Sequence, residues 1–409
     1  MLNWVNRFNI CCFLDNHQYR SAHQSVECLA AAGAVNIFSP QKNLLPQLSE
    51  FSREHNDWLF GHISYDLKNE IEPLRSAHPD HIGFPDAFFF QPETVLQLKN
   101  DQLIISSLTH DPEIIFDELK NSPPTMNHGP WTINIEPRIS KEEYISTIKK
   151  ILTHIQRGDC YEINYCQEFF AIGVDVDPLY LYMQLTAISP NPFSCFYKLK
   201  EKYLLCASPE RYLQKKGDHI LSQPIKGTFK RDPGNTQADN ELKKQLQQSE
   251  KDKSENVMVV DIVRNDLSRI CKEGTVKVDE LFGVYSFPQV HQMISTITGE
   301  LKNDVDISDM IKATFPMGSM TGAPKRRVME LIEQYEKTKR GIYSGAVGYI
   351  SPEKDFDFNV VIRSILYNAV ERYLNYLVGG GITFYSDPEK EYEECLLKAD
   401  AIKKVLQGN

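Results

Sequence analysis

The sequence predicts an α+β protein in which mainly antiparallel sheets pack face to face, with helices on the outside. Strand-like segments with two-residue alternation outnumber the helical segments that could serve as crossovers, which argues against a doubly wound parallel sheet. The 409 residues, 41% of them hydrophobic, are enough to bury a sizeable core. We expect two lobes, 1–122 and 138–409, intertwined into one compact unit with a substrate site in the cleft between them.

Composition and charge restrict the classes of partner. The formal net charge of -10 argues against nucleic acid, because nucleic-acid-binding domains usually carry a basic surface. No run approaches the roughly 18 apolar residues of a membrane helix, and the N-terminus lacks a basic segment followed by an apolar core. We therefore expect a cytoplasmic protein without a nucleic-acid or membrane partner. The nine cysteines include no Cys-x-x-Cys pair, and we assign none to zinc.

The first half of the chain predicts structure more than chemistry. Residues 88–90 read as a buried strand, and the proline-punctuated stretch 123–137 predicts a connection between lobes. Ser140 and Glu143 form a capping-box pattern at the start of a helix, and Gly158 predicts its end. Alternation from residue 161 onward predicts strands.

Residues 221–231 predict a rigid bend that holds a lysine. Pro224 fixes one backbone torsion and Gly227 frees another, so Lys226 has a defined position beside the hydroxyl of Thr228. Taken alone, a lysine in this pattern is more often a solvated turn residue.

Two helical segments each offer a pair of carboxylates. Residues 239–270 are mostly helical in pattern, with Asp252 and Glu255 on one face. The last helix carries Glu391 and Glu394 on one face. Two such helices could enclose Mg²⁺, which prefers oxygen ligands, although each pair alone is more often a solvated acidic face.

Several blocks follow one another along the chain, namely 208–212 (SPERY), 224–228 (PIKGT), 255–261 (ENVMVVD), 286–291 (SFPQVH), 317–325 (MGSMTGAPK) and 379–382 (GGGI). In this order they resemble the signature blocks of the chorismate-utilising enzymes, and the resemblance runs from about residue 142 to the end of the chain. The family includes anthranilate, aminodeoxychorismate, isochorismate and salicylate synthases. The resemblance implies an anthranilate-synthase-like fold of two lobes. The block PIKGT resembles the form in component I of aminodeoxychorismate synthases, because anthranilate synthases are expected to carry alanine in place of Lys226.

The resemblance implies a transaminase-type reaction in which chorismate and ammonia give 4-amino-4-deoxychorismate, on the route to p-aminobenzoate and folate. It gives Lys226 the role of covalent nucleophile at C2, Glu210 that of general acid to the C4 hydroxyl, and His291 a place in the active site. We expect the pKa of Lys226 to lie below that of free lysine, since burial and a nearby metal ion would favour the neutral amine. Glu210 should stay protonated part of the time.

The resemblance also implies the ligands of the metal and of the substrate. Mg²⁺ would be bound by Glu255 and Glu394, with Asp252 and Glu391 acting through water. Tyr343 and Arg363 would hold the enolpyruvyl carboxylate, although an arginine in an apolar strand more often pairs with an internal carboxylate. Segments 343–346 and 361–364 are both interpreted as strands. The substrate-binding residues implied are Thr228, Ser319, Tyr343, Arg363, Gly379, Gly381 and Lys398.

Glu162 and the source of ammonia bear on the choice among activities. Glu162 lies where salicylate and isochorismate synthases carry a water-activating lysine, which counts against those activities, and its own role is left open. No Cys-His glutaminase signature is apparent, so ammonia is expected from a separate glutamine amidotransferase subunit. Two alternatives are anthranilate synthase component I, which would release pyruvate, and a non-catalytic chorismate-binding subunit.

Overall fold

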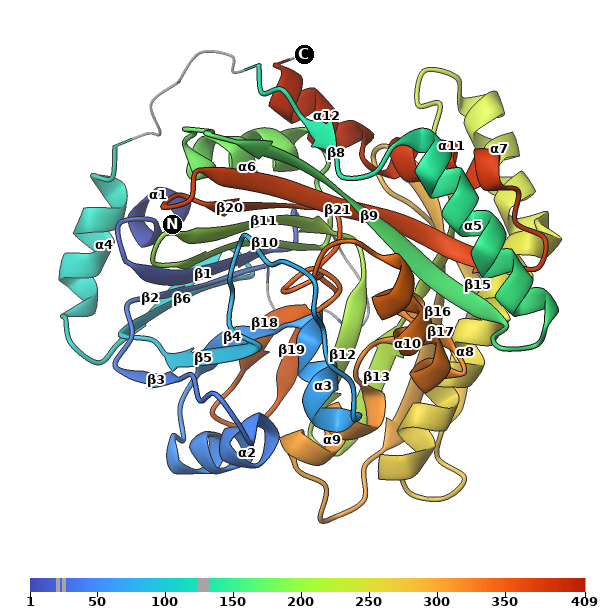
Figure 1. The fold of residues 1–409 in the computed structure, drawn as a ribbon. Helices are drawn as coiled ribbons and strands as arrows, with labels where there is room; N and C mark the ends of the chain where they lie inside the picture. The colour runs from blue at the N-terminus through green and yellow to red at the C-terminus, as the bar shows by residue number, and fades with distance from the viewer. Residues whose placement is uncertain (20–22, 24–26, 124–131, 409) are drawn as a thin grey trace.

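The structure is a computed structural model that describes residues 1–19, 23, 27–123 and 132–408. Two large sheets pack face to face, with helices on the outside (Figure 1). Neighbouring strands run antiparallel in both sheets. The predicted α+β class and sandwich arrangement are therefore confirmed.

The first sheet combines strands from the N-terminal, middle and C-terminal parts of the chain. In spatial order they are β17 (Gly322–Ala323), β9 (Glu162–Ile172), β21 (Tyr373–Thr383), β20 (Ser364–Asn368), β11 (Lys202–Ser208), β10 (Phe193–Leu199), β1 (Ile10–Asp15), β2 (Cys28–Ala32), β6 (Thr94–Lys99) and β7 (Gln102–Ser107), with β8 (Glu136–Pro137) paired to β9.

The second sheet carries Lys226 on its edge strand β14 (Ile225–Lys230), where the sequence predicted a bend. In spatial order it contains β14 (Ile225–Lys230), β16 (Val290–Glu300), β13 (His219–Gln223), β12 (Arg211–Lys216), β19 (Phe356–Asn359), β18 (Ala346–Ile350), β4 (Leu59–Ile63), β5 (Ala87–Gln91) and β3 (Asn36–Phe38), with β15 (Lys277–Ser286) paired to β16. Strands from the first 107 residues thus join both sheets.

Helices cover the outer faces of the sandwich. Around the first sheet lie α1 (Leu2–Val5), α4 (Pro112–Lys120), α5 (Lys141–Gln156), α6 (Pro178–Ile188), α10 (Lys325–Tyr335), α11 (Pro388–Lys398) and α12 (Asp400–Gln407). Around the second lie α2 (Leu44–Glu54), α3 (Lys68–Ile71), α7 (Thr236–Gln248), α8 (Glu250–Ile270) and α9 (Ile307–Thr314), and two short 3-10 turns are η1 (Tyr65–Leu67) and η2 (Gly318–Met320). No described helix is both long and apolar enough to cross a membrane.

Alternation along a strand divides its side chains between two cores. In β1, Ile10 and Cys12 lie in the core shared with the second sheet, whereas Cys11 and Phe13 lie under the outer helices. Strand β1 is therefore largely buried on both faces, whereas the edge strand β7 alternates between exposed and partly buried residues.

Local sequence signals located the helices well. Ser140 accepts a hydrogen bond from the backbone N–H of Glu143 at 3.2 Å, and Gly158 follows α5 with φ +80°. The single helix expected over 239–270 is in fact two, because Ser249 ends α7 and caps α8. The last helix likewise divides, at Ala399. The connection expected over 123–137 falls partly on 124–131, outside the described residues.

Two strand predictions near the cleft are wrong. Residues 343–345 form a turn that leads into β18 at Ala346, and residues 361–363 are irregular and lead into β20 at Ser364. Ser344 and Arg363 have φ values of 61° and 53°, in the left-handed region that a strand does not allow. The apolar residues beside Ser344 and Arg363 gave the pattern of a strand. Such residues are apolar because they are buried, and a buried segment need not have an extended backbone.

Candidate active site

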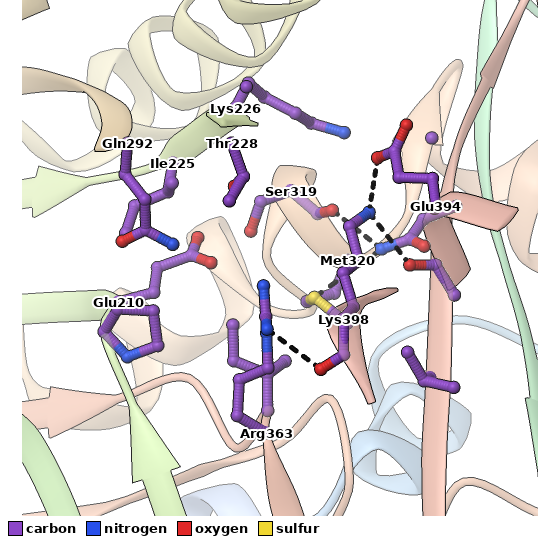
Figure 2. Close-up of a pocket in the computed structure, with 18 of the residues that line it drawn as sticks. Glu210, Ile225, Lys226, Thr228, Gln292, Ser319, Met320, Arg363, Glu394 and Lys398 are labelled. Carbon is purple, nitrogen blue, oxygen red and sulfur yellow. Dashed lines mark hydrogen bonds and ion pairs between the residues drawn. The ribbon is translucent and has the colours of Figure 1, made fainter. Parts of the chain in front are cut away.

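A cavity of about 900 Å³, including space open to solvent, lies between β14, β21, α8 and α11. Its lining brings together residues that are far apart in the sequence (Figure 2). The predicted site residues that line it are Glu210, Lys226, Thr228, Asp252, Glu255, Ser319, Tyr343, Arg363, Gly379, Gly381, Glu394 and Lys398. His291 and Glu391, also predicted, do not line it.

Lys226 lies in a β-bulge and not in a simple turn. Ile225 pairs with Ile294 and Thr228 with Gln292, so three steps along β14 match two along β16. Gly227 provides the bend with φ +85°. The bulge turns the side chain of Lys226 into the cavity, where its ammonium forms an ion pair with Glu162 of β9.

The charge around Lys226 reverses the expectation for its pKa. Burial lowers the pKa of Lys226, but the carboxylates of Glu162, Glu255 and Glu210 together raise it above the ordinary value for lysine. The prediction of a lowered pKa is therefore wrong for the protein without metal or substrate. The sequence could not show this, because the three acids come from three separate segments.

Glu210 has the opposite environment. Glu210 lies between β11 and β12 and is 4% exposed. Burial raises the pKa of its carboxyl to about 7, and Ser319 and Lys226 partly offset this rise. A carboxyl with this pKa is protonated part of the time near neutral pH, as expected for a general acid.

The acidic end of the cavity is occupied by a lysine that the sequence analysis did not select. The Nζ atom of Lys251 lies 3.3 Å from an oxygen of Glu391, 3.8 Å from Glu255 and 3.9 Å from Glu394. Glu391 is 2% exposed and lies behind the lining at Gly380. The carboxylates of α8 and α11 thus face a common point, at which the structure places an ammonium group.

This donor set has the chemistry of a site for a hard divalent cation. All of its ligating atoms are carboxylate oxygens, and Glu255 Oε1 is buried without a hydrogen-bond partner among the described residues. Burial raises the pKa of Glu255 to about 7, whereas Lys398 lowers that of Glu394 to about 2. Within the described residues no three acids are close enough to form a metal cluster, since Lys251 separates them. The residues fit Mg²⁺ once that ammonium moves aside.

The opposite end of the cavity offers an unpaired cation. Arg363 donates a hydrogen bond to the backbone oxygen of Lys398 at 2.9 Å, and no described carboxylate lies within ion-pair distance of its guanidinium. The internal partner considered from the sequence is therefore not found among the described residues. Lys398 itself contacts Gly379 O at 3.1 Å and Glu394 at 2.8 Å. Arg363 is therefore placed to bind an anionic ligand, and the nearby hydroxyl of Tyr343 contacts Cys166 Sγ at 3.8 Å.

Comparison of the chain with known proteins identifies its family. A family model described as chorismate binding enzyme matches residues 11–404. The chain belongs to the chorismate-binding enzyme family. Residues 11–404 include every residue of the cavity lining, so the match covers the whole site.

Relatives of this chorismate-binding enzyme include aminodeoxychorismate synthases. Component 1 from Salmonella typhimurium is 34% identical over 399 residues, which cover 95% of this chain and 87% of that protein. A probable chloroplastic aminodeoxychorismate synthase from Oryza sativa is 43% identical over 272 residues, 66% of this chain but only 30% of that protein. Among solved structures, anthranilate synthase component I from Streptococcus pneumoniae is 25% identical with a TM-score of 0.81, covering 94% of this chain and 95% of the other.

In this chorismate-binding enzyme, His291 lies outside the cavity for which the sequence predicted it. His291 is 1% exposed and its ring nitrogens contact Ser286 Oγ at 2.9 Å and Asp239 Oδ1 at 3.1 Å, outside the cavity. The next residue, Gln292, lines the cavity instead, because successive side chains of a strand point in opposite directions. Asn164 was also missed, and it donates to Ser319 O at 2.9 Å from β9. Neither Gln292 nor Asn164 lies in a pattern that marks a site in sequence.

Proposed function

We propose that this chain is the synthase component of an aminodeoxychorismate synthase, which converts chorismate and ammonia to 4-amino-4-deoxychorismate. The observation that carries the proposal is the buried Lys226 facing the same cavity as Glu210, whose pKa of about 7 suits a general acid. The relatives named aminodeoxychorismate synthase support the choice of product.

Arg363 would bind one carboxylate of chorismate. Arg363 can hold the enolpyruvyl carboxylate in a bidentate pair with help from Tyr343, because no described acid competes for its guanidinium. Thr228 and Ser319 line the space between Arg363 and Lys226, so their hydroxyls can bind ring oxygens. The substrate ring would then lie with C2 toward Lys226 and C4 toward Glu210.

The chemistry would take place in two displacements. Lys226 in its neutral form adds to C2 while the C4–O bond breaks, and the proton of Glu210 goes to the leaving oxygen to give water. Ammonia then adds at C4 while the bond between C2 and Nζ breaks, and the extra proton returns to Glu210. The ion pair with Glu162 supplies an acceptor for the proton that Lys226 must lose.

Glu255 and Glu394 would bind Mg²⁺, with Asp252 and Glu391 acting through water molecules. The bound ion supplies positive charge beside the ring carboxylate and the leaving hydroxyl. Lys251 must leave the centre of these carboxylates first, and its side chain, 44% exposed, has room to do so. With Lys251 displaced, Glu255 and Glu394 would exchange a charge of +1 for one of +2, and the added positive charge would favour the neutral form of Lys226.

The proposal also includes the class of the reaction, the protein that supplies ammonia and the location of both proteins. We place the reaction in the transaminase-type class of transferases, with ammonia delivered by a separate glutamine amidotransferase and both proteins in the cytoplasm. The relative from Salmonella typhimurium is itself named as a component, which supports a partner.

One incubation tests the function. Purified protein is mixed with chorismate, MgCl₂ and ammonium at mildly alkaline pH, and the products are separated by mass and ultraviolet spectrum. We expect a product that keeps the enolpyruvyl group and has gained an amine. Anthranilate with released pyruvate would show an anthranilate synthase instead, and tight chorismate binding without turnover would show a non-catalytic subunit.

A further inference from the structure

Ser319 has a buried hydroxyl that forms no hydrogen bond of ordinary geometry with the described residues. The residue is 6% exposed and lines the cavity. Figure 2 shows Ser319 next to the carboxyl of Glu210, and its hydroxyl lies close enough to lower the pKa of that carboxyl. Buried hydroxyls are nearly always paired, so one that faces a ligand site points to a ligand group that pairs with it.

The backbone that carries this hydroxyl is held through three successive carbonyl groups. Asn164 donates to Ser319 O from its Nδ2 atom at 2.9 Å and to Thr321 O from its backbone N–H at 2.7 Å. Between these two bonds, the guanidinium of Arg340 donates to Met320 O at 2.7 Å. Donors from outside the segment thus fix its carbonyl groups, and the hydroxyl of Ser319 stays available to a ligand.

Arg340 connects this loop to the strand beside it. Its side chain is 1% exposed and forms a bidentate ion pair with Glu336, with distances of 2.6 and 2.9 Å. It also donates to Asn164 O at 2.8 Å, so one guanidinium holds both the loop and the residue of β9 that bonds to the loop. A buried ion pair is often no more stable than apolar side chains in the same space. The bonds from Arg340 to the loop therefore point to a role in placing Ser319.

We propose that Arg340 and Asn164 are positioning residues that hold the hydroxyl of Ser319 beside Glu210 and the reacting ring. This inference rests on the proposed function and deepens it. When Glu210 gives its proton to the oxygen that leaves C4, the O–H of Ser319 donates to the carboxylate that remains. Ser319 keeps its own proton throughout, so the proton balance of the reaction is unchanged.

The contact with Ser319 sets the strength of Glu210 as an acid. Burial raises the pKa of Glu210, and the hydroxyl of Ser319 and the charge of Lys226 limit the rise to about 7. An acid with a higher pKa transfers its proton less readily. Loss of the Ser319 contact should therefore weaken the acid while the carboxyl itself stays in the cavity.

Arg340→Lys tests the inference, because it keeps the positive charge opposite Glu336. An ammonium group is a point charge and cannot bond two carboxylate oxygens and two carbonyls in the planar fork of a guanidinium. We expect the limb of kcat/KM near pH 7 to move to higher pH by about one half to one pH unit, since Glu210 loses a hydrogen bond that lowers its pKa. Ser319→Ala should give the same shift.

Arg138→Lys is the matched control. Arg138 also pairs with a buried carboxylate, that of Glu168 at 2.8 Å, but its side-chain hydrogen bonds go to Glu168 and Tyr373 and it does not line the cavity. The pH limb and the affinity for chorismate should both match those of the original protein.

The binding of chorismate gives a second readout that needs no amine product. With MgCl₂ and without ammonia, Ser319→Ala and Arg340→Lys should each raise the dissociation constant about fivefold, the size of one lost hydrogen bond. Because Arg340 acts through Ser319, the variant with both changes should also bind about fivefold more weakly. Two independent roles would multiply to about 25-fold.

An unmoved pH limb in Arg340→Lys, or losses that multiply in the double variant, would overturn the proposal. If the original protein makes no amine product, the proposed function itself fails, and the comparison of dissociation constants still decides the role of Arg340. Should Arg340→Lys not fold, Asn164→Ala removes the side-chain bond to Ser319 O and is judged by the same two readouts.

Discussion

Glu162 of β9 and Lys226 of β14 form an ion pair that joins the two sheets inside the cavity. Both residues are buried, at 1% and 8% exposure. Gly381 on β21 leaves the space for this pair, since a Cβ there would lie 2.7 Å from Glu162 Oε1 and 2.8 Å from Lys226 Nζ. The pair fixes the direction of the lysine and favours its charged form.

Glu162→Gln should make Lys226 easier to deprotonate. The carboxylate of Glu162 contributes to the raised pKa of Lys226, so its removal lowers that pKa. If neutral Lys226 is required, the rise of kcat with increasing pH should move to lower pH in the variant. Measurement of kcat from pH 6 to 10 checks the shift, and an unmoved profile would contradict the link between the pair and catalysis.

Lys226→Ala should lose aminodeoxychorismate formation about 100-fold or more, because it removes the covalent nucleophile. Lys230→Ala, at the exposed end of the same strand, is the control and should keep the original rate. The rate of amine product formation with ammonia is the measurement. A fully active Lys226→Ala protein would show that ammonia attacks without a lysine intermediate.

Activity should also depend on the protonation of Glu210. Its raised pKa of about 7 means that the carboxyl is protonated below this pH and loses its proton as pH rises through it. We expect kcat/KM for chorismate, which reports the free enzyme, to fall with a limb near pH 7. Glu210→Gln should remove this limb and lower the rate about 100-fold. A limb that persists in the variant would belong to another group.

The sequence predicted the parts of the site that lie on regular elements. Asp252 and Glu255 share a face of α8, and Glu394 projects from α11, so helical spacing alone brought each pair together. The antiparallel architecture was predicted from the number of segments in which apolar and polar residues alternate. Such alternation indicates a strand with one buried face, and these segments outnumber the helical crossovers that a parallel sheet needs.

The rest of the site depends on contacts that no local pattern contains. Arg363 and Ser344 occupy left-handed backbone positions between apolar residues, where periodicity predicts strands. The pKa of Lys226 is raised against the effect of burial by Glu162, which is 64 residues away in the chain, and by Glu255 and Glu210. The register of β16 against β14 decides that Gln292 and not His291 lines the cavity. A shift of one residue in this register would reverse the face of every side chain.

Lys251→Met should strengthen the binding of Mg²⁺. Its ammonium now neutralises Glu255, Glu391 and Glu394, and a metal ion must displace it from all three. Ion pairs with this degree of exposure are weak, so we expect the dissociation constant for Mg²⁺, measured by calorimetry without substrate, to fall about tenfold. Lys253→Met is the control, because Lys253 on the same helix pairs only with the exposed Glu250 among the described residues. Unchanged or weaker binding in Lys251→Met would mean that the metal binds elsewhere or that Lys251 remains in place beside it.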